Sequence, residues 1–173
     1  MPIASPELVL LIGNPRAGSR TRAVAERFAS RLGVVPCEVL ELAELTGVTY
    51  GAFAVAPAIS DEAALDRVRA ARLLVVATPS YKGTYTGLLK LFLDRVPHLG
   101  LDGVVAVPIA VAASPAHAAA TGADLARLLR ELGAHVPVEV PVLESELETA
   151  DLDRAAGLVR AEERVPHSAD RTA

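Results

Sequence analysis

Residues 7–33 read ELVLLIGNPRAGSRTRAVAERFASRLG and change character at Gly13. Before that point, Glu7–Ile12 contains a short unbroken apolar run, typical of a strand buried on both faces. After the loop, Ser19–Leu32 carries apolar residues at helical spacing, and Gly33 follows as a stop signal. A buried strand joined by a short loop to an amphipathic helix predicts the first unit of an α/β fold.

The same alternation continues along the rest of the chain. Further strands are expected at residues 38–42, 73–77, 104–112 and 136–142. Further helices are expected at residues 61–71, 86–96, 116–132 and from about 147 to 163. The last strand contains two prolines, which favours a position at the sheet edge. Alternating strands and helices predict a doubly wound parallel sheet, and five strands fit the flavodoxin-like order 2-1-3-4-5.

Length and composition limit the class of protein. The 173 residues suit one domain, expected at 1–165, followed by a polar tail at 166–173 that is expected to be disordered. A hydrophobic content of 51% excludes wholesale disorder, and a net charge of −4 argues against a nucleic-acid surface. The single Cys37 excludes internal disulfides and a four-thiolate metal site. With no apolar run approaching the roughly 20 residues of a membrane span and no signal-peptide pattern, we expect a cytoplasmic protein.

Two unusual loops follow the first and third predicted strands. In a sheet of order 2-1-3-4-5, the ligand crevice lies beyond the carboxyl ends of these two strands, where the winding direction reverses. Loops 13–20 and 78–86 both fall at this point. Their coincidence predicts a ligand site at this edge of the sheet.

Loop 13–20 has the composition of an anion site. It ends at a helix N-terminus, where unpaired N–H groups and the positive end of the helix dipole face an incoming anion. Ser19 and Thr21 add hydroxyl groups, and Arg16 and Arg20 add positive charge. The loop lacks both the Lys-Ser/Thr of a nucleotide-binding P-loop and the Gly-x-Gly-x-x-Gly of a dinucleotide site, which favours a terminal phosphate. The alternative is an ordinary helix cap at Ser19 with solvated arginines.

Residues 78–97, TPSYKGTYTGLLKLFLDRVP, hold two of the three tyrosines and both lysines of the chain. A planar aromatic ligand at the crevice could use the backbone N–H groups of this loop and the edge of Tyr81. The alternative is an ordinary loop in which Tyr81 and Tyr85 cover a hydrophobic surface.

This segment resembles the NADPH-dependent FMN reductase family, whose signature has the form Thr-Pro-x-Tyr-x-x-x-Tyr-x-Gly-x-Leu-Lys-x-x-Leu-Asp. The resemblance covers roughly residues 7 to 143. Within the family, the chain looks most similar to the reductase components of two-component flavin monooxygenases. It implies an FMN-binding domain, with NADPH or NADH as the hydride donor.

The resemblance also implies a set of site residues. The FMN phosphate would lie on Asn14, Arg16, Ser19, Arg20 and Thr21. The isoalloxazine ring would lie on Pro79, Ser80, Tyr81, Lys82 and Gly83. Ser114 and His117 would belong to the third wall of the site. Two departures are visible: Ala112-Ala113 stands where many relatives carry Gly-Gly, and Ala123 stands near a tyrosine of the alkanesulfonate-type relatives.

The function that follows from this resemblance is NAD(P)H-dependent FMN reduction. The bound cofactor carries the chemistry, so we expect no catalytic acid, base, nucleophile or metal from the chain. Reduced FMN either leaves for a partner monooxygenase or stays bound and reduces a quinone, an azo dye or a metal ion. A non-catalytic flavin-binding protein on the same fold is the alternative from a different class.

Two further segments carry predictions. Helix 86–96 is apolar around most of its circumference, which predicts a homodimer, or a dimer of dimers, through this helix. Lys90 and Asp94 could form an i,i+4 or intersubunit ion pair there. The charged run 144–164 is typical of a solvated helix face.

Overall fold

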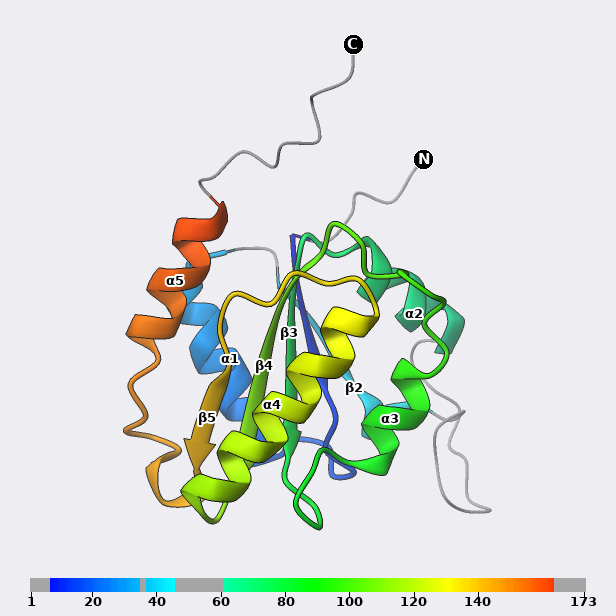
Figure 1. Ribbon diagram of the computed structural model, residues 1–173. Coiled ribbons are helices and arrows are strands. Elements are labelled where there is room, and N and C mark those ends of the chain that lie inside the picture. Colours follow the sequence, from blue (N-terminus) through cyan, green and yellow to red (C-terminus); the bar gives the residue numbers. More distant parts are fainter. Residues whose placement is uncertain (1–6, 35–36, 46–60, 164–173) are drawn as a thin grey trace.

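The computed structural model of the protein describes residues 7–34, 37–45 and 61–163. Five strands form one parallel sheet in the order β2-β1-β3-β4-β5 (Figure 1). The strands are β1 (Leu8–Ile12), β2 (Cys37–Glu41), β3 (Leu73–Pro79), β4 (Val105–Ala112) and β5 (Val140–Leu143). This arrangement confirms the flavodoxin-like, doubly wound fold predicted from the sequence.

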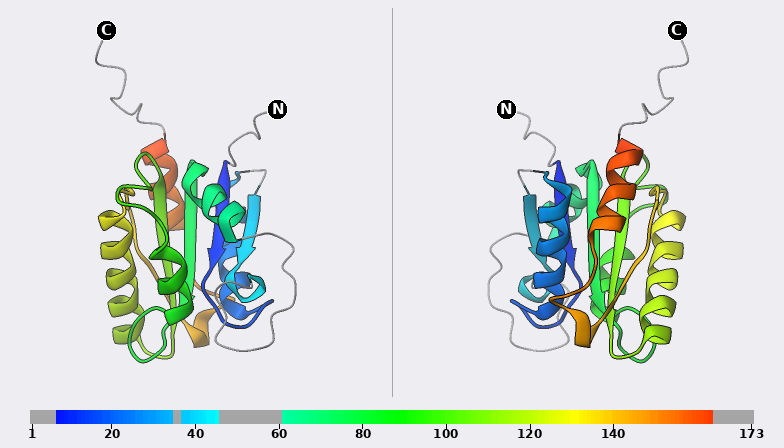
Figure 2. Two further views of the ribbon diagram at one scale, coloured as in Figure 1. Left: turned by 90° about the vertical axis from the view of Figure 1, so that its right-hand side faces the viewer. Right: turned by 90° about the vertical axis from the view of Figure 1, so that its left-hand side faces the viewer.

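Helices cover both faces of the sheet (Figure 2). They are α1 (Arg20–Leu32), α2 (Asp61–Ala70), α3 (Gly87–Leu93), α4 (Pro115–Glu131) and α5 (Asp153–Glu163). Helices α1 and α5 lie side by side on one face, and α2, α3 and α4 cover the other. Short 3₁₀ turns, η1 (Leu42–Glu44) and η3 (Glu144–Glu146), follow β2 and β5. None of the helices in the described ranges is long and apolar enough to cross a bilayer.

Strand β1 shows why the core has two halves. All five of its residues are apolar and buried, and successive side chains point to opposite faces. Val9 and Leu11 pack with α2, α3 and α4, whereas Leu8 and Leu10 pack with α1 and α5. A central parallel strand therefore needs apolar residues at every position.

Helix α1 begins and ends where its capping residues predict. Ser19 is the N-cap, and its Oγ accepts a hydrogen bond from the backbone N–H of Arg22 at 3.3 Å. At the other end, Gly33 adopts a left-handed φ of 71°, and its N–H donates to the carbonyl of Ala29 at 3.2 Å. These caps place the first turn of the helix directly after the loop that follows β1.

The predicted strand 136–142 is wrong at its start, because β5 covers only Val140–Leu143. His135 makes an isolated parallel bridge to Val105, accepting a hydrogen bond from Ala106 N–H at 2.7 Å. The next ladder bond would need the N–H of Pro137, which proline lacks. The chain therefore leaves the sheet after one bridge and returns at Val140, and β5 pairs only with β4, at the sheet edge as predicted.

The last helix also differs from its prediction. It starts at Asp153 and not near Leu147, because the side chain of Asp151 accepts a hydrogen bond from Asp153 N–H at 3.1 Å and caps the helix there. Residues 144–146 form the separate turn η3. The tail predicted at 166–173 lies outside the described residues.

Helix α3 is shorter and better covered than its sequence indicates. It ends at Leu93, and the bonds from Arg95 N–H to Phe92 and from Val96 N–H to Leu93 tighten the chain into a 3₁₀-type turn before Pro97. Its buried apolar residues, Leu88, Leu89, Phe92 and Leu93, belong to the core of this same chain. Only Leu91, 46% exposed, is a large apolar side chain of α3 open to solvent.

Candidate functional site

The candidate site lies at the carboxyl edge of the sheet, where β1 pairs with β2 on one side and β3 on the other. The chain winds in opposite directions from this point, so the loops that follow β1 and β3 diverge and leave a crevice. We call residues 13–19 the anion loop and residues 80–86 the hairpin loop. Both lie at the same end of the sheet (Figure 1).

Asn14 folds the anion loop upon itself. Its Oδ1 accepts a hydrogen bond from the backbone N–H of Arg16 at 2.9 Å, and its Nδ2 donates to Thr21 Oγ1 at 3.1 Å. Gly18 takes a φ of 62°, a conformation that residues with a Cβ rarely adopt. Both ends of the Asn14 amide are thereby used within the chain, so this side chain shapes the loop. The hydroxyl of Thr21, which accepts here, keeps its own proton for another acceptor.

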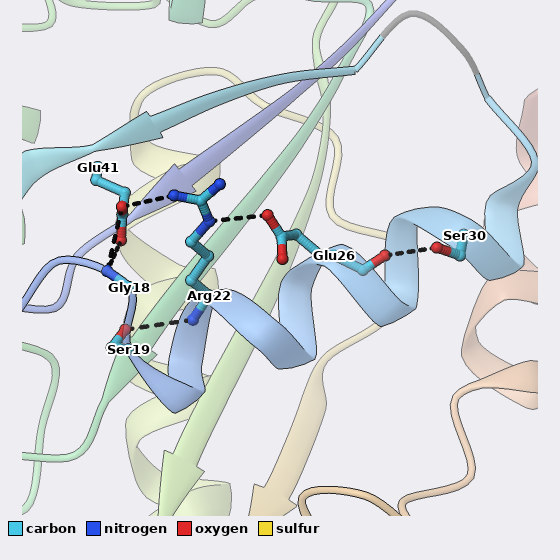
Figure 3. A network of polar contacts seen from close by, with 6 residues as sticks. All are labelled: Gly18, Ser19, Arg22, Glu26, Ser30 and Glu41. Carbon is cyan, nitrogen blue, oxygen red and sulfur yellow. Dashed lines mark hydrogen bonds and ion pairs between the residues drawn. The ribbon is translucent and has the colours of Figure 1, made fainter.

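Glu41 clamps the anion loop from the neighbouring strand, a role that the sequence analysis missed. Its carboxylate accepts the Gly18 N–H at 2.9 Å (Oε1) and 3.3 Å (Oε2), and its Oε2 accepts from Arg22 Nη1 at 2.8 Å (Figure 3). The Glu41 side chain is only 2% exposed. A buried carboxylate is stable only when it is paired and hydrogen-bonded, and both conditions are met here.

Arg22 completes this clamp. Its Nε donates to Glu26 Oε1 at 2.8 Å, one turn along α1 (Figure 3). The hydrogen bonds that Arg22 donates, first to Glu26 and second to Glu41, raise its pKa above the ordinary value. The clamp therefore holds one N–H of the loop in place through a carboxylate that is itself fixed by a guanidinium.

A cavity of about 280 Å³ opens at the N-terminus of α1. Its lining residues are Asn14, Arg16, Ala17, Gly18, Ser19, Arg20, Thr21, Pro79, Val111 and Glu144. Two guanidinium groups, two hydroxyls and a helix N-terminus converge there, and this set suits a small polyoxygen anion. One acidic group, Glu144, approaches Arg20 with 3.8 Å between Oε2 and Nη2.

The hairpin loop is a two-residue turn with left-handed backbone. Tyr81 N–H donates to the carbonyl of Thr84 at 2.8 Å, and Thr84 N–H returns a bond to Tyr81 at 3.3 Å. Between them, Lys82 and Gly83 have φ values of 56° and 87°, the pattern of a type I′ turn. Glycine accepts this conformation freely, whereas lysine is strained there. The turn leaves Tyr81 47% exposed, which argues against a core-covering role for its ring.

Helix α4 holds the hairpin loop through two hydrogen bonds donated by threonine hydroxyls. Thr121 Oγ1 donates to Ser80 Oγ at 2.8 Å, and Thr84 Oγ1 donates to Asp124 at 2.9 Å. Ser80 N–H donates to the carbonyl of Val111 at 2.7 Å.

These bonds leave fewer free donors than the resemblance implies for residues 80–83. The N–H groups of Ser80 and Tyr81 donate to carbonyl groups within the chain. In the part of the chain that the structure describes, the N–H groups of Lys82 and Gly83 have no acceptor. A ligand ring beside this loop would therefore meet two free donors.

Thr86 joins the two loops. Its Oγ1 donates to the carbonyl of Gly13 at 2.5 Å and accepts from Leu89 N–H at 3.2 Å, and its own N–H donates to Thr78 at 3.3 Å. Gly13 must be glycine here, because an added Cβ would lie 2.9 Å from the Cβ of Leu89. One buried hydroxyl thus sets the spacing between the anion loop and the start of α3.

The structure brings together the five residues predicted to hold the phosphate, and Pro79 joins them at the cavity wall. The other residues predicted for the ring, Ser80 to Gly83, lie beside the cavity and not in its lining. Ser114 caps α4 by accepting from His117 N–H at 3.3 Å, and the His117 side chain is exposed. Of the two alanines that replace Gly-Gly, Ala112 is buried and only Ala113 presents its methyl group to solvent.

Comparison with known proteins agrees with this geometry. The family model described as NADPH-dependent FMN reductase matches residues 6–147. The NADH-dependent FMN reductase SfnF of Pseudomonas putida is 33% identical over 74% of this chain and 72% of its own length. The FMN reductase (NADPH) of Escherichia coli strain K12 is 30% identical over 83% of this chain and 85% of its own length.

Solved structures give the same answer. The apo form of an NADH:FMN oxidoreductase (EMOB) superposes with a TM-score of 0.76 at 30% identity, covering 90% of this chain and 88% of that one. A flavodoxin of Streptococcus pneumoniae TIGR4, at 18% identity and a TM-score of 0.59, shows the shared fold alone. The residues of the hairpin loop, the sheet order and these matches together confirm the resemblance: the chain belongs to the NADPH-dependent FMN reductase family, NAD(P)H:FMN oxidoreductases that use FMN with NADPH or NADH.

Proposed function

We propose that this protein transfers a hydride from NADPH or NADH to FMN, with the FMN phosphate in the cavity of the anion loop. The observation that carries this proposal is the convergence of Arg16, Arg20, Ser19 and Thr21 on a cavity of about 280 Å³ at the N-terminus of α1. That donor set fits a phosphate monoester, which offers three acceptor oxygens and a charge of about −1.5 to −2.

The chain supplies position and a polar environment. When bound, FMN supplies the ring that accepts the hydride. The anion loop fixes the phosphate end of the ligand. The free N–H groups of Lys82 and Gly83 offer hydrogen bonds to a ring lying against the hairpin loop, where they would favour added negative charge. Orientation of two bound reactants then accounts for most of the rate gain, without a proton-transferring side chain.

The destination of the reduced flavin is the finer part of the proposal. We propose that reduced FMN is released to a partner monooxygenase. This proposal rests on the resemblance of the chain to the reductase components of two-component flavin monooxygenases. The cytoplasmic location, expected from the absence of a membrane-span pattern and a signal-peptide pattern in the sequence, stays part of this proposal. A tightly held FMN that reduces quinones or azo dyes, and a flavin-binding protein without turnover, are the two competing functions.

One purification separates these functions. The visible spectrum of the purified protein is recorded, and NADPH and NADH oxidation is then followed with and without added FMN. A colourless protein that oxidises NAD(P)H only when FMN is added supports the proposal. A yellow protein active toward quinones without added FMN favours the tightly bound alternative. Colour without turnover would favour a binding protein and contradict the proposed reaction.

We also propose a homodimer, or a dimer of dimers, that uses α3. The support within the chain is narrower than the sequence indicates, because Leu91 is its one exposed large apolar residue and the Lys90–Asp94 ion pair forms within a single chain. Sedimentation velocity at micromolar concentration tests this assembly. A monomer at that concentration contradicts it.

A further inference from the structure

Glu144 is the one acidic side chain in the lining of a cavity that otherwise suits an anion. It is the first residue of η3 and follows directly after β5. Its Oε2 lies 3.8 Å from Arg20 Nη2, within ion-pair range but too far for a hydrogen bond. The side chains of Arg20 and Glu144 are 73% and 45% exposed, so this contact is solvated and easily exchanged.

The two arginines of the cavity differ in whether a carboxylate of the same chain lies beside them. Arg20 has Glu144 as a partner, whereas Arg16 has no carboxylate partner among the residues that the structure describes. An arriving phosphate therefore finds one free guanidinium and one that a carboxylate of the same chain already occupies. It must exchange places with Glu144 at Arg20, and it must then sit near the negative charge of that displaced carboxylate.

We propose that Glu144 acts as an internal competitor for the phosphate of FMN and sets the flavin affinity below the value that the arginines alone would give. This inference rests on the proposed function. A lowered affinity suits that function, because a reductase that supplies reduced flavin to another protein must release its product. Glu144 is then a residue that determines affinity, and it touches the ligand's charged end and not the reacting ring.

The proposal predicts that removing this acid improves binding. In Glu144→Gln the size and polarity of the side chain are kept while the charge is lost. One charge pair at a solvated site corresponds to a change of about three- to tenfold in affinity. The dissociation constant of FMN should fall by about that factor. Riboflavin, which has no phosphate, should bind the variant and the wild type alike, and added salt should reduce the FMN effect.

The control variant is Glu146→Gln. Glu146 lies on the same short turn η3, is exposed, and does not line the cavity, so its substitution changes the net charge equally without touching the proposed contact. Fluorescence titration with FMN and riboflavin is performed on wild type and both variants, at low and high salt. Inorganic phosphate is added as a competitor, and its inhibition constant, corrected for the FMN affinity of each protein, should be lower for Glu144→Gln than for wild type.

The outcomes distinguish a failure of the Glu144 proposal from a failure of the proposed reductase function. Tighter FMN binding in Glu144→Gln alone, with riboflavin unchanged, supports the proposal. Unchanged or weaker FMN binding, equal tightening in Glu146→Gln, or equal tightening of riboflavin overturns it while leaving the reductase function intact. Wild type that binds FMN and riboflavin equally well would instead refute the placement of the phosphate, and wild type that binds no FMN would refute the proposed function and this inference together.

Discussion

The anion loop and the hairpin loop lie at the same edge of the sheet but are held by different forces. The anion loop is tied by charge, through the carboxylate of Glu41 and the guanidinium of Arg22. The hairpin loop is tied by hydroxyl groups, through Thr84 on Asp124 and Thr121 on Ser80. The loop that we propose for the phosphate is thus ordered by an ion pair, and the loop that we propose for the ring is held by short polar side chains.

This difference has a physical consequence for each loop. Ionic contacts that reach solvent, as at Arg22, weaken as salt screens them, whereas hydrogen bonds donated by threonine hydroxyls do so much less. The two halves of the site should therefore respond differently to ionic strength and to single substitutions. The following variants test the comparison.

The largest effect is expected at Thr86, which serves both loops. Thr86→Val removes the N-cap of α3 and leaves the buried carbonyl of Gly13 without its donor. A lost cap costs about 1 kcal/mol and an unsatisfied buried group about 1–3 kcal/mol, so we expect about 2–4 kcal/mol of lost stability. Urea unfolding measures this loss. Thr84→Val, which removes only the bond to Asp124, should cost about 1 kcal/mol, and an equal loss in both variants would contradict the linking role of Thr86.

The next effect is expected at the ionic clamp. Glu41→Gln keeps an acceptor for Gly18 N–H but removes the charge that faces Arg22. Because the Arg22 side chain is 36% exposed, we discount the full cost of a broken buried pair and expect a loss of about 1–2 kcal/mol, with weaker FMN binding. Glu26→Gln breaks only the exposed pair and should cost about 0–1 kcal/mol. The clamp is refuted if the Glu26 variant proves the more damaging of the two.

The pH dependence of the clamp follows from the direction of the Arg22 shift. Its pKa is raised, so its stabilising contribution is fully present below the ordinary arginine pKa and is lost only as pH rises through the raised value. Between about pH 6 and 9, the arginine side of the clamp should therefore contribute a constant amount. The stability difference between Glu26→Gln and wild type, measured across that range, should be flat.

A third variant tests the anion loop by its ligand. Arg20→Ala should weaken FMN binding by about 1–2 kcal/mol, the lower part of the range for a charge-assisted hydrogen bond, because the side chain is 73% exposed. Riboflavin affinity should stay unchanged. Arg31→Ala removes a charge from the last turn of the same helix and serves as the control. A riboflavin loss as large as the FMN loss would place the phosphate elsewhere.

The smallest effect is expected at Tyr81 in the hairpin loop. Tyr81→Ala should weaken FMN binding by about 0.5–1.5 kcal/mol, the scale of one aromatic contact, and should leave the melting temperature unchanged, since the residue is half exposed. Tyr85→Ala is the matched control, because Tyr85 packs against the core and its loss should lower stability. Both quantities are measured on one sample of each variant. A fall in melting temperature for Tyr81→Ala would mean that its ring supports the fold.

Much of this molecule could be predicted from local sequence signals. Buried strands and capped helices are indicated by runs of neighbouring residues, as with Leu8–Ile12 and the caps Ser19 and Gly33. The number and alternation of these elements then predicted the sheet order. Likewise the five residues predicted to hold the phosphate lie close together in the sequence, within residues 14–21.

The contacts that the sequence did not predict join segments that are far apart in the chain. Glu41 reads as one of two acids in a short strand, and its partners Gly18 and Arg22 become visible only when β2 is placed beside β1. Glu144 reads as the first residue of a solvated charged run, but it opens the turn η3 directly after β5, and this turn places it beside Arg20. Neither residue can be assigned until the strands are in register, because each acts across a strand pair or a strand end.

The hydrogen bond from Thr86 to the carbonyl of Gly13 spans 73 residues of chain. Closing a loop of that length carries an entropic cost that only docked strands can offset, and non-local contacts of this kind form late in folding. While the protein is being synthesised, the anion loop emerges well before the residue that fixes its position. We therefore expect flavin binding to appear only with the final, cooperative step of folding, so that an incomplete chain ending before α3 would sequester no cofactor.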